Sequence, residues 1–552
     1  MNFLIVVPRF SKKGEFYSFP FGLAYISSYL KSRGFKVQVL NLCHFEEAIP
    51  TFDILKSSIA ENGIDAILTG GMSGHWNLIA DVLSTAKKIK PDIITIAGGP
   101  ITTSDPNLAM ENMRIDYGVI GEGEITSGEL ARALEENGDV AAVDGIICRK
   151  NGALVQTKER SAISDLDSLP FPDYEGFGYR EWMATMKYSD QNPILENYET
   201  VNYSPIIGSR SCPFSCTFCY HPLGKKYRQR SLDNIFLEID FLVGTYGSNF
   251  ISFADELFSL NTERMYELAD RIKKYDIYWE ACFRVNNITA ELLSKLKESN
   301  LHYMGFGVES LSDKILKSMK KMITKAEIEN AFRLAREAGI FCSGNIILGD
   351  PEETIETINE SIDWWKKNPQ YNISLIFIKA IPDSAVYRYA LENNLIKNNL
   401  NHIKNNFPII NLTKIPDKKF NKIKKELLSY RTSLKNIVDG ELLESKKTGE
   451  KYKNKNYYLI KAKCPFCGQI HDYKRFFKSI SRHLAIFCKN CHSNFKLEQK
   501  KIFYDEFNLI KMFSNIYTTR LYSRLIKNNI IKADGKNIIA LKRVVKKILK
   551  KN

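Results

Sequence analysis

Three cysteines within eight residues are the part of this sequence with the clearest chemistry. Cys212, Cys216 and Cys219 have the spacing C-x-x-x-C-x-x-C. Cysteine thiolates are the usual ligands of iron–sulfur clusters, and three of them can hold one face of a 4Fe-4S cluster. A fourth cysteine at matching spacing is missing, so one iron would keep an open site at which a chelating substrate can bind and be reduced. Zinc is the competing metal, but a structural zinc site generally takes four protein ligands.

A second cysteine group lies in the C-terminal third of the chain. It reads C-x-x-C, twenty residues, C-x-x-C, and consists of Cys464, Cys467, Cys488 and Cys491. Four thiolates at this spacing predict a closed tetrahedral zinc site, that is, a zinc ribbon at residues 460–500. An auxiliary iron–sulfur cluster is the alternative, because thiolates serve both. The N-terminus lacks the features of a signal peptide, so we expect a cytoplasmic protein without disulfides.

The elements that must position a reactive site begin with an alternating pattern in residues 1–150. Short apolar runs alternate with amphipathic helical stretches, which predicts a doubly wound parallel sheet. Ligands of such sheets bind beyond the carboxyl ends of the strands. Three glycine-rich loops are placed there, at 70–74, 98–103 and 121–124. None is a G-x-G-x-x-G fingerprint, so a nicotinamide dinucleotide is not expected. The alternative is that these glycines only close turns. The predicted strands are 2–7, 37–42, 66–68, 93–97 and 117–120.

This region resembles the cobalamin-binding domain of cobalamin-dependent radical S-adenosylmethionine (SAM) enzymes. The resemblance rests on Pro20-Phe21-Gly22-Leu23-Ala24, the Gly-Gly-Pro turn at 98–100 and the Gly-Glu-Gly-Glu segment at 121–124. The Asp-x-His-x-x-Gly motif of cobalamin mutases is absent, and we expect His75 to pack rather than to bind cobalt. The cobalamin-binding residues that the resemblance implies are Gly70, Ser73, Gly98, Gly99, Thr102, Gly121, Glu122 and Gly123.

The cysteine motif and the 170 residues after it are similar to the radical SAM domain of the same family. In that family the open iron binds the amino and carboxylate groups of SAM, and reduction cleaves a carbon–sulfur bond to release a 5′-deoxyadenosyl radical. The resemblance covers about residues 1–395 and implies an open (β/α)6 barrel with its chemistry at the carboxyl ends of the strands. Taken singly, each matching residue could be a cap or a surface charge. The SAM-binding residues implied are Phe218, Tyr220, Asp255, Glu256, Arg284, Glu309 and Ser310.

The charge is distributed unevenly along the chain. The 552 residues carry a formal charge of +15. Residues 1–400 contain 42 Lys and Arg against 52 Asp and Glu, whereas residues 401–552 contain 36 against 11. The basic part, which ends in an amphipathic stretch at 537–552, could meet a membrane surface or nucleic acid, or could pack on its own protein. A codon bias toward Lys, Asn and Ile is the plain alternative. No apolar run reaches the ~18 residues of a membrane span.

These observations predict an α/β protein of four parts. They are a cobalamin-binding domain at 1–150, a linker at 151–200, a radical SAM domain at 201–395 and a basic α+β region with the zinc ribbon at 396–552. We expect a cobalamin-dependent radical SAM methyltransferase acting at an unactivated carbon, with a cyclase or skeletal rearrangement enzyme as the alternative. Its partners would be an organic substrate, anionic or carrier-linked, and an external one-electron reductant.

Two other classes fit the residues less well. A methylthiotransferase acting on tRNA needs additional cluster cysteines near its N-terminus, and only Cys43 and Cys148 occur there. A zinc-ribbon nucleic-acid-binding or sensing protein would not need the cysteine motif at 212–219. Substrate, oligomeric state and the choice of zinc or cluster at the second cysteine group are left open by the sequence.

Overall fold

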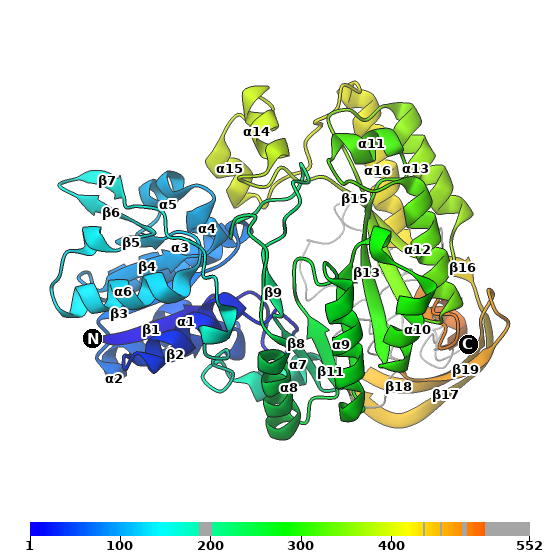
Figure 1. Cartoon of the computed structure of the whole chain (residues 1–552), viewed down its shortest axis with the longest axis horizontal. Coiled ribbons are helices and arrows are strands. Elements are labelled where there is room, and N and C mark those ends of the chain that lie inside the picture. Colours follow the sequence, from blue (N-terminus) through cyan, green and yellow to red (C-terminus); the bar gives the residue numbers. More distant parts are fainter. Residues whose placement is uncertain (187–200, 434–436, 453–454, 477–482, 503–552) are drawn as a thin grey trace, which may run out of the picture. The chain divides into compact units, whose positions relative to one another are not determined.

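The computed structural model describes residues 1–186, 201–433, 437–452, 455–476 and 483–502 (Figure 1). It divides into two compact units, one of Met1–Arg431 with Cys491–Ser493 and one of Thr432–Asn490 with Asn494–Asn552. The stretch 537–552, for which the sequence predicts a basic helix, lies outside the described residues, as does part of the linker, 187–200.

The first sheet of the larger unit has seven strands in the order β2-β1-β3-β4-β5-β6-β7. The first five pair in parallel and confirm the predicted doubly wound sheet. The last two pair antiparallel and extend the sheet past residue 150. The strands are β1 (Asn2–Val7), β2 (Lys36–Asn41), β3 (Ala66–Gly70), β4 (Ile94–Gly98), β5 (Tyr117–Val119), β6 (Ile146–Lys150) and β7 (Ala153–Gln156).

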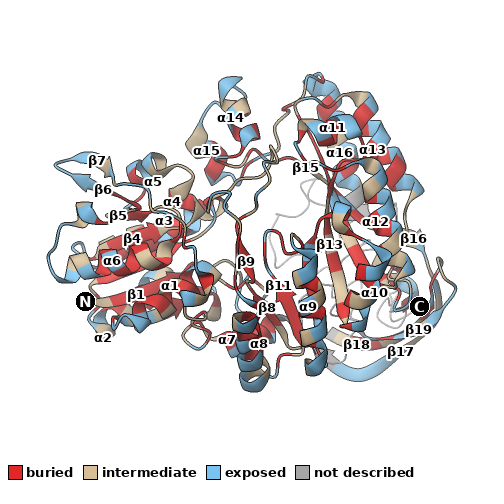
Figure 2. Ribbon diagram, in the orientation of Figure 1, coloured by how far each residue is buried: buried red, intermediate tan, exposed pale blue. Residues whose placement is uncertain are grey.

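Helices cover both faces of this sheet, and β1 is therefore buried on both sides (Figure 2). Successive strand residues point to opposite faces. Ile5 and Val7 share a core with residues of α1 (Phe21–Ser32) and α6 (Gly123–Glu135). Leu4 and Val6 share another with α2 (Thr51–Asn62) and α3 (Trp76–Ile89). Two short helices, α4 (Pro100–Thr103) and α5 (Pro106–Asn112), follow β4.

The second sheet has six parallel strands in the order β15-β14-β13-β12-β11-β8. Helices alternate with the strands, as in the predicted (β/α)6 arrangement, and β8 and β15 are its two edges within the described residues. The strands are β8 (Tyr203–Ile206), β11 (Phe250–Phe253), β12 (Tyr278–Phe283), β13 (Leu301–Glu309), β14 (Phe341–Leu348) and β15 (Asn372–Phe377). The helices are α8 (Leu232–Tyr246), α9 (Thr262–Ile272), α10 (Ala290–Glu298), α11 (Asp313–Ser318), α12 (Lys325–Glu337) and α13 (Ile355–Lys367).

After β15 the chain returns to the first sheet through α14 (Ala385–Glu392) and α15 (Asn399–Lys404). Ile403 and Phe407 are buried in the same core as Trp76 and Ile79 of α3. The Asn77 side-chain amide donates a hydrogen bond to the Lys404 carbonyl at 3.0 Å. Residues 400–407 therefore complete a core that begins in the first 150 residues.

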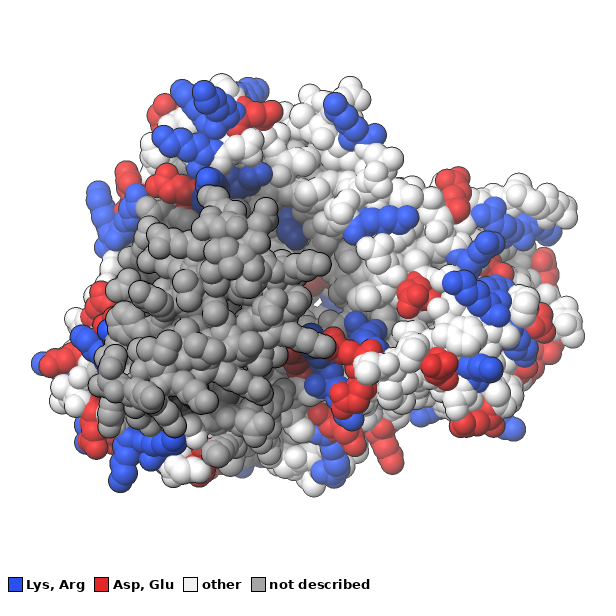
Figure 3. Space-filling view, turned by 180° about the vertical axis from the view of Figure 1, so that it is seen from behind, with Lys and Arg blue, Asp and Glu red and all other residues white. Residues whose placement is uncertain are grey.

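The smaller unit consists mainly of antiparallel strand pairs, and one short strand, β16, adds in parallel to β21. Its strands are β16 (Val438–Asp439), β17 (Glu441–Tyr452), β18 (Lys455–Lys463), β19 (Ile470–Phe476), β20 (His483–Phe487) and β21 (Asn494–Glu498). The connections β18–β19 and β20–β21 carry the two C-x-x-C pairs. On the described surface seen in Figure 3, basic and acidic side chains are interspersed. Within the described chain, no helix is both long and apolar enough to cross a bilayer.

Candidate functional site

The three cysteines of the first motif lie in the loop that follows the short strand β9 (Ser209–Arg210). All three are free thiols of intermediate burial. Burial raises their pKa values, that of Cys219 to about 12, and the neighbouring thiols and Glu256 contribute to the rise at Cys219. Thiols with raised pKa values stay protonated at neutral pH until a metal displaces the protons. A three-thiol set with an open position fits a 4Fe-4S cluster.

The stem of this loop is held by Asp255, which follows β11. One carboxylate oxygen accepts a hydrogen bond from the Gly208 amide at 2.7 Å and the other accepts one from the Ser209 hydroxyl at 2.6 Å. Burial raises the pKa of Asp255 to about 6. The carboxylate is thus already engaged by the protein.

The adjacent Glu256 is placed differently. Its side chain is exposed, and its charge raises the pKa values of Cys219 and Tyr220. Although the residue is exposed, partial desolvation of its carboxyl group raises the pKa of Glu256, and no hydrogen bond to a described residue contributes to this rise. Of the acidic pair named from the sequence, Glu256 is the member whose carboxylate forms no hydrogen bond with a described residue.

Arg284 contacts the same loop from the end of β12. Its guanidinium lies 3.7 Å from the centre of the Phe214 ring, and its Nη2 donates to the Lys321 carbonyl at 2.6 Å. The buried Nε has no hydrogen-bond partner among the described residues. An unpaired guanidinium N–H suits a carboxylate or phosphate group.

Glu309 ends β13 in the left-handed region, at φ 65°. Its carboxylate accepts a hydrogen bond from the Lys321 ammonium at 2.7 Å. A side chain at Gly307 would crowd this pair, because its Cβ would lie 2.4 Å from the Lys321 Nζ. The neighbouring Ser310 is fully buried and its hydroxyl is engaged by Ser361 and by the Ser312 amide.

The two aromatic residues beside Cys219 have different surroundings. Phe218 packs against an apolar cluster that includes Met319 and Ile347. Tyr220 reaches the other sheet, where its hydroxyl donates to the Met72 sulfur at 3.1 Å. Met72 lies in the loop after β3 and is 45% exposed. The cysteine loop thus contacts the glycine-rich loop after β3.

The glycine-rich loops meet at the carboxyl edge of the first sheet. A Cβ at Gly70 would lie 2.4 Å from the Gly98 carbonyl oxygen, and Gly99 adopts φ 84°, so neither position accepts a side chain without strain. Ser73 donates to the Pro100 carbonyl and Thr102 to the Val119 carbonyl, which ties the loops together. Gly121, at φ 76°, has open space around it. This glycine-lined edge, with its β3–β5 loops, fits the approach of a large planar ligand.

The two acidic residues of the loop after β5 form hydrogen bonds within the protein. Glu122 accepts hydrogen bonds from Arg210, Arg228 and the Ile163 amide, and Glu124 accepts one from Arg210. Gly123 has no room for a side chain, since its Cβ would lie 2.8 Å from Ile26.

His75 is the imidazole nearest these loops along the chain. Its ring lies 4.4 Å from that of Phe10, centre to centre, and burial lowers its pKa. Its buried Nδ1 has no partner among the described residues.

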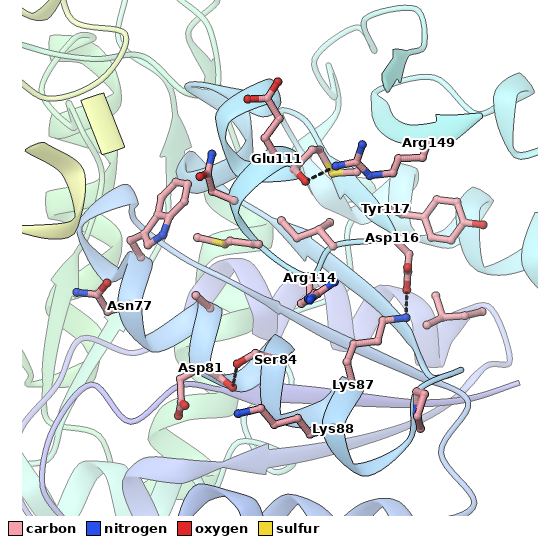
Figure 4. A pocket seen from close by; sticks show the side chains of 18 of the residues that line it. Asn77, Asp81, Ser84, Lys87, Lys88, Glu111, Arg114, Asp116, Tyr117 and Arg149 are labelled. Atoms are coloured by element: carbon pink, nitrogen blue, oxygen red, sulfur yellow. Dashed lines mark hydrogen bonds and ion pairs between the residues drawn. The ribbon is translucent and has the colours of Figure 1, made fainter. Parts of the chain in front are cut away.

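A separate groove of about 1550 Å³ lies between α3 and α5. It is lined by the first residues of β4 and β5, Ile94 and Tyr117, and so lies toward the amino ends of these strands. Two of its basic groups are engaged, Lys87 by Asp116 at 2.7 Å and Arg149 by the Met110 carbonyl at 2.8 Å (Figure 4). The groove faces away from the glycine-rich loops.

The second cysteine group forms a compact four-sulfur site. The sulfur atoms of Cys464, Cys467, Cys488 and Cys491 all lie within 4.8 Å of one another. The amides of Phe466 and Asn490 point at the sulfurs of Cys464 and Cys488, each at 3.4 Å. Four thiolates oriented in this way can hold a tetrahedral zinc ion, and thiolates can also hold an iron–sulfur cluster.

Four charged residues of the site were not identified from the sequence. Arg210, Arg228, Glu124 and Lys321 are all buried. The position of Arg210, two residues before Cys212, was the available signal, but its partners lie 86 and 88 residues away.

Two family models match the chain. The radical SAM superfamily model matches residues 206–364, which contain the three cysteines, Asp255, Arg284 and Glu309. The B12-binding domain model matches residues 12–131, which contain the three glycine-rich loops. The matches agree with the parallel strands of the two sheets and with the ligands that each set of loops fits.

Several known proteins are similar to this chain in sequence or in fold. The chain is 30% identical over 383 residues to "Uncharacterized methyltransferase PH0819" of Pyrococcus horikoshii, covering 68% of this chain and 79% of that protein. It is 27% identical to the anaerobic magnesium-protoporphyrin IX monomethyl ester cyclase of Rubrivivax gelatinosus, covering 62% of each. Its fold resembles that of the radical SAM methyltransferase TsrM from Kitasatospora setae, solved with cobalamin and a 4Fe-4S cluster, with a TM-score of 0.58 at 18% identity over 71% of this chain and 79% of that one.

Proposed function

Because this chain belongs to the radical SAM superfamily and carries a B12-binding domain, we propose that it is an enzyme that methylates an unactivated carbon of an organic substrate. The observation that carries the proposal is the contact between Tyr220 and Met72. This contact brings the loop of the cluster cysteines next to the loop after β3. A radical formed at the cluster and a methyl group carried by cobalamin could therefore reach the same substrate.

The cofactors would divide the chemistry between the two sheets. When bound, the 4Fe-4S cluster supplies the electron that cleaves SAM to methionine and a 5′-deoxyadenosyl radical, and cobalamin carries the methyl group. An external one-electron donor would reduce the cluster. The protein would hold the cluster through Cys212, Cys216 and Cys219, and would hold cobalamin along the glycine-rich loops at 70–74, 98–103 and 121–124.

The residues that would bind SAM are the charged and aromatic side chains around the cysteine loop. We assign the amino group of SAM to Glu256, whose carboxylate is exposed beside the cysteines. We assign its carboxylate to Arg284, whose Nε is unpaired among the described residues. Glu309, held by Lys321, would contact the remainder of SAM. The aromatic groups of Phe218 and Tyr220 flank Cys219 where the adenine would lie.

A ring-forming or rearranging enzyme is the second candidate. The similarity to the magnesium-protoporphyrin cyclase, 27% identity over 363 residues, supports it. The two reactions differ in products. A methyltransferase consumes a second SAM to restore the methyl group and releases S-adenosylhomocysteine together with 5′-deoxyadenosine, whereas a cyclase releases 5′-deoxyadenosine alone.

The basic region bears on the substrate. Residues 401–552 carry 36 Lys and Arg against 11 Asp and Glu. Opposite charge attracts a ligand over several ångströms at low ionic strength. We therefore propose an anionic or carrier-linked substrate, with the four-cysteine zinc site as a structural support of this region.

Anaerobic reconstitution of the full chain with iron, sulfide, hydroxocobalamin and SAM tests the proposal. We expect about four irons at the first cysteine motif beyond any metal at the second, and 5′-deoxyadenosine on reduction. The variant Cys216→Ala should form no 5′-deoxyadenosine, with Cys43→Ala as the matched control. Reductive SAM cleavage by Cys216→Ala, or failure of the protein to bind cobalamin, would overturn the proposal.

A further inference from the structure

A buried ionic network joins the loop after β5 to the stem of the cysteine loop. Glu122 accepts hydrogen bonds from the Arg210 Nη1 at 2.8 Å and from the Arg228 Nη1 at 2.6 Å. Glu124 accepts one from the Arg210 Nη2 at 2.6 Å. The four side chains are at most 9% exposed, and their two positive and two negative charges balance.

The network ends on the residue before the first cluster cysteine. The Arg228 Nη2 donates to the Ser211 hydroxyl at 3.1 Å, and that hydroxyl donates to the Leu223 carbonyl at 3.0 Å. Arg210 and Arg228 also pair as neighbours on β9 and β10 (Arg228–Gln229). Ser211 therefore connects the two ends of the loop that contains the cysteines.

The backbone at Ser211 needs this support. Its φ is 68°, in the left-handed region that non-glycine residues adopt at a cost. A strained conformation persists where the surrounding structure fixes it, and such positions cluster at functional sites. The adjacent Asp255 holds only the residues before it, Gly208 and Ser209.

The Glu122 carboxylate already accepts three hydrogen bonds, which leaves little room for one from cobalamin. One of its oxygens accepts from Arg210, and the other accepts from both Arg228 and the Ile163 amide. The neighbouring arginines hold the pKa of Glu122 below its usual range despite burial, so the group is charged at neutral pH. A buried charge with three donors is a fixed structural anchor, since removal of one partner leaves the others uncompensated.

We propose that Glu122 is a positioning residue for the iron–sulfur cluster, acting through Arg228 and Ser211 on the backbone that presents Cys212. The B12-binding domain would thus supply the carboxylate that sets the geometry of the cluster in the radical SAM domain. This inference rests on the proposed function in one respect, namely that Cys212 is a cluster ligand.

The test compares Glu122→Gln with Glu136→Gln in the full chain after anaerobic reconstitution. Glu122 and Glu136 flank the two ends of α6, and Glu136 pairs with Arg132 on the surface at 3.6 Å. We expect Glu122→Gln to bind hydroxocobalamin as the wild type does. We also expect it to shift the EPR g-values of the reduced cluster and to slow 5′-deoxyadenosine formation about tenfold, as loss of a positioning contact does. Glu136→Gln should match the wild type in all three measurements.

Two results would overturn the inference. One is a cluster spectrum and SAM cleavage rate for Glu122→Gln equal to those of Glu136→Gln. The other is loss of cobalamin binding in Glu122→Gln with the cluster unchanged, which would make Glu122 a cobalamin ligand.

A smaller change decides the matter if Glu122→Gln does not fold. Ser211→Ala removes only the hydroxyl that links Arg228 to the loop, and Ser215→Ala is its matched control, since the exposed Ser215 hydroxyl contacts Lys225. We expect the altered EPR spectrum in Ser211→Ala alone, and identical spectra for both variants would contradict the inference. A wild-type protein that assembles no 4Fe-4S cluster would instead refute the proposed function.

Discussion

The Lys321 ammonium and the Glu309 carboxylate form a hydrogen-bonded ion pair at 2.7 Å, with each side chain only about one-tenth exposed. Glu309 ends β13 and Lys321 follows α11, so the pair brings a cation from outside the sheet to the carboxyl edge of its strands. Burial raises the pKa of the Cys216 thiol, and the same ammonium offsets part of that rise. Lys321 thus acts on both the acidic residue assigned to SAM and the cysteine assigned to the cluster.

Replacement of Lys321 by methionine should weaken SAM binding. Loss of the ammonium leaves the buried Glu309 carboxylate without its partner, and hydrogen bonds to charged groups contribute ~1.5–3 kcal/mol, so we expect about a tenfold rise in the Kd for SAM. Equilibrium dialysis of the reconstituted protein measures this. Lys320→Met is the control, because Lys320 is adjacent and exposed. Equal affinities of the two variants would exclude a role for the pair.

The neighbouring acids Asp255 and Glu256 should have separable effects. Asp255→Ala leaves the Gly208 amide unsatisfied and leaves the Ser209 hydroxyl only the Leu257 carbonyl, at 3.2 Å. An unsatisfied buried donor costs ~1–3 kcal/mol, so the thermal unfolding midpoint and the iron content should fall. Glu256→Gln should leave both unchanged and raise the Kd for SAM. Calorimetry, iron analysis and dialysis on both variants distinguish the roles. A drop in the unfolding midpoint of Glu256→Gln, with SAM binding intact, would reverse the assignment.

Glu353 should make the stability of the protein depend on pH. Burial raises its pKa from 4.5 to about 8, and its Oε1 has no partner among the described residues, so the folded chain holds it protonated at neutral pH. A carboxyl with a raised pKa stabilises the fold fully below its unfolded pKa, and this contribution is lost as the pH rises toward 8. Glutamine carries no proton to lose.

We therefore expect the unfolding midpoint of the wild type to fall more between pH 6 and pH 8.5 than that of Glu353→Gln. Thermal unfolding in matched buffers measures the difference. Glu352→Gln is the control, since Glu352 is half-exposed and pairs with Lys414 at 3.3 Å. Parallel pH profiles for wild type and Glu353→Gln would show that the carboxyl is ionised in the fold.

The four-cysteine site should hold one zinc ion per chain. Cys467→Ser removes one of four ligands, and a closed tetrahedral site with three thiolates binds zinc far more weakly. We expect zinc by mass spectrometry to fall from about one per chain to a small fraction, with the cluster iron unchanged. Loss of iron and sulfide rather than zinc would identify an auxiliary cluster instead.

Much of the fold was predictable because its signals are local. The five parallel strands of the first sheet, beginning with Asn2–Val7, are short, apolar and closed by turns, and the cysteine spacings are contiguous motifs. The antiparallel strands β6 and β7 were not predicted. β6 (Ile146–Lys150) ends in two charged residues and β7 (Ala153–Gln156) is only four residues long, so neither forms a clear apolar run.

The limits of the sequence are clearest at the site. The family resemblance implies that Glu122 binds cobalamin. Its ion-pair partners Arg210 and Arg228 lie 88 and 106 residues away, and no periodic pattern in the sequence encodes such a pairing. Asp255 and Glu256 are adjacent acidic residues of one motif, and the sequence does not distinguish them. In the structure, Ser209 of β9 donates a hydrogen bond to Asp255, whereas Glu256 has no hydrogen bond to a described residue.

The packing of Ile403 and Phe407 beside Trp76 also affects when the first domain can finish folding during synthesis. Domains generally fold as units from the N-terminus as the ribosome extends the chain at ~5–20 residues per second. The first sheet is fully synthesised at Gln156, but this core stays open until Phe407 emerges, roughly 10–50 s later at that rate. A newly made first domain must therefore wait, with apolar surface of α3 uncovered, for nearly the whole radical SAM domain to follow.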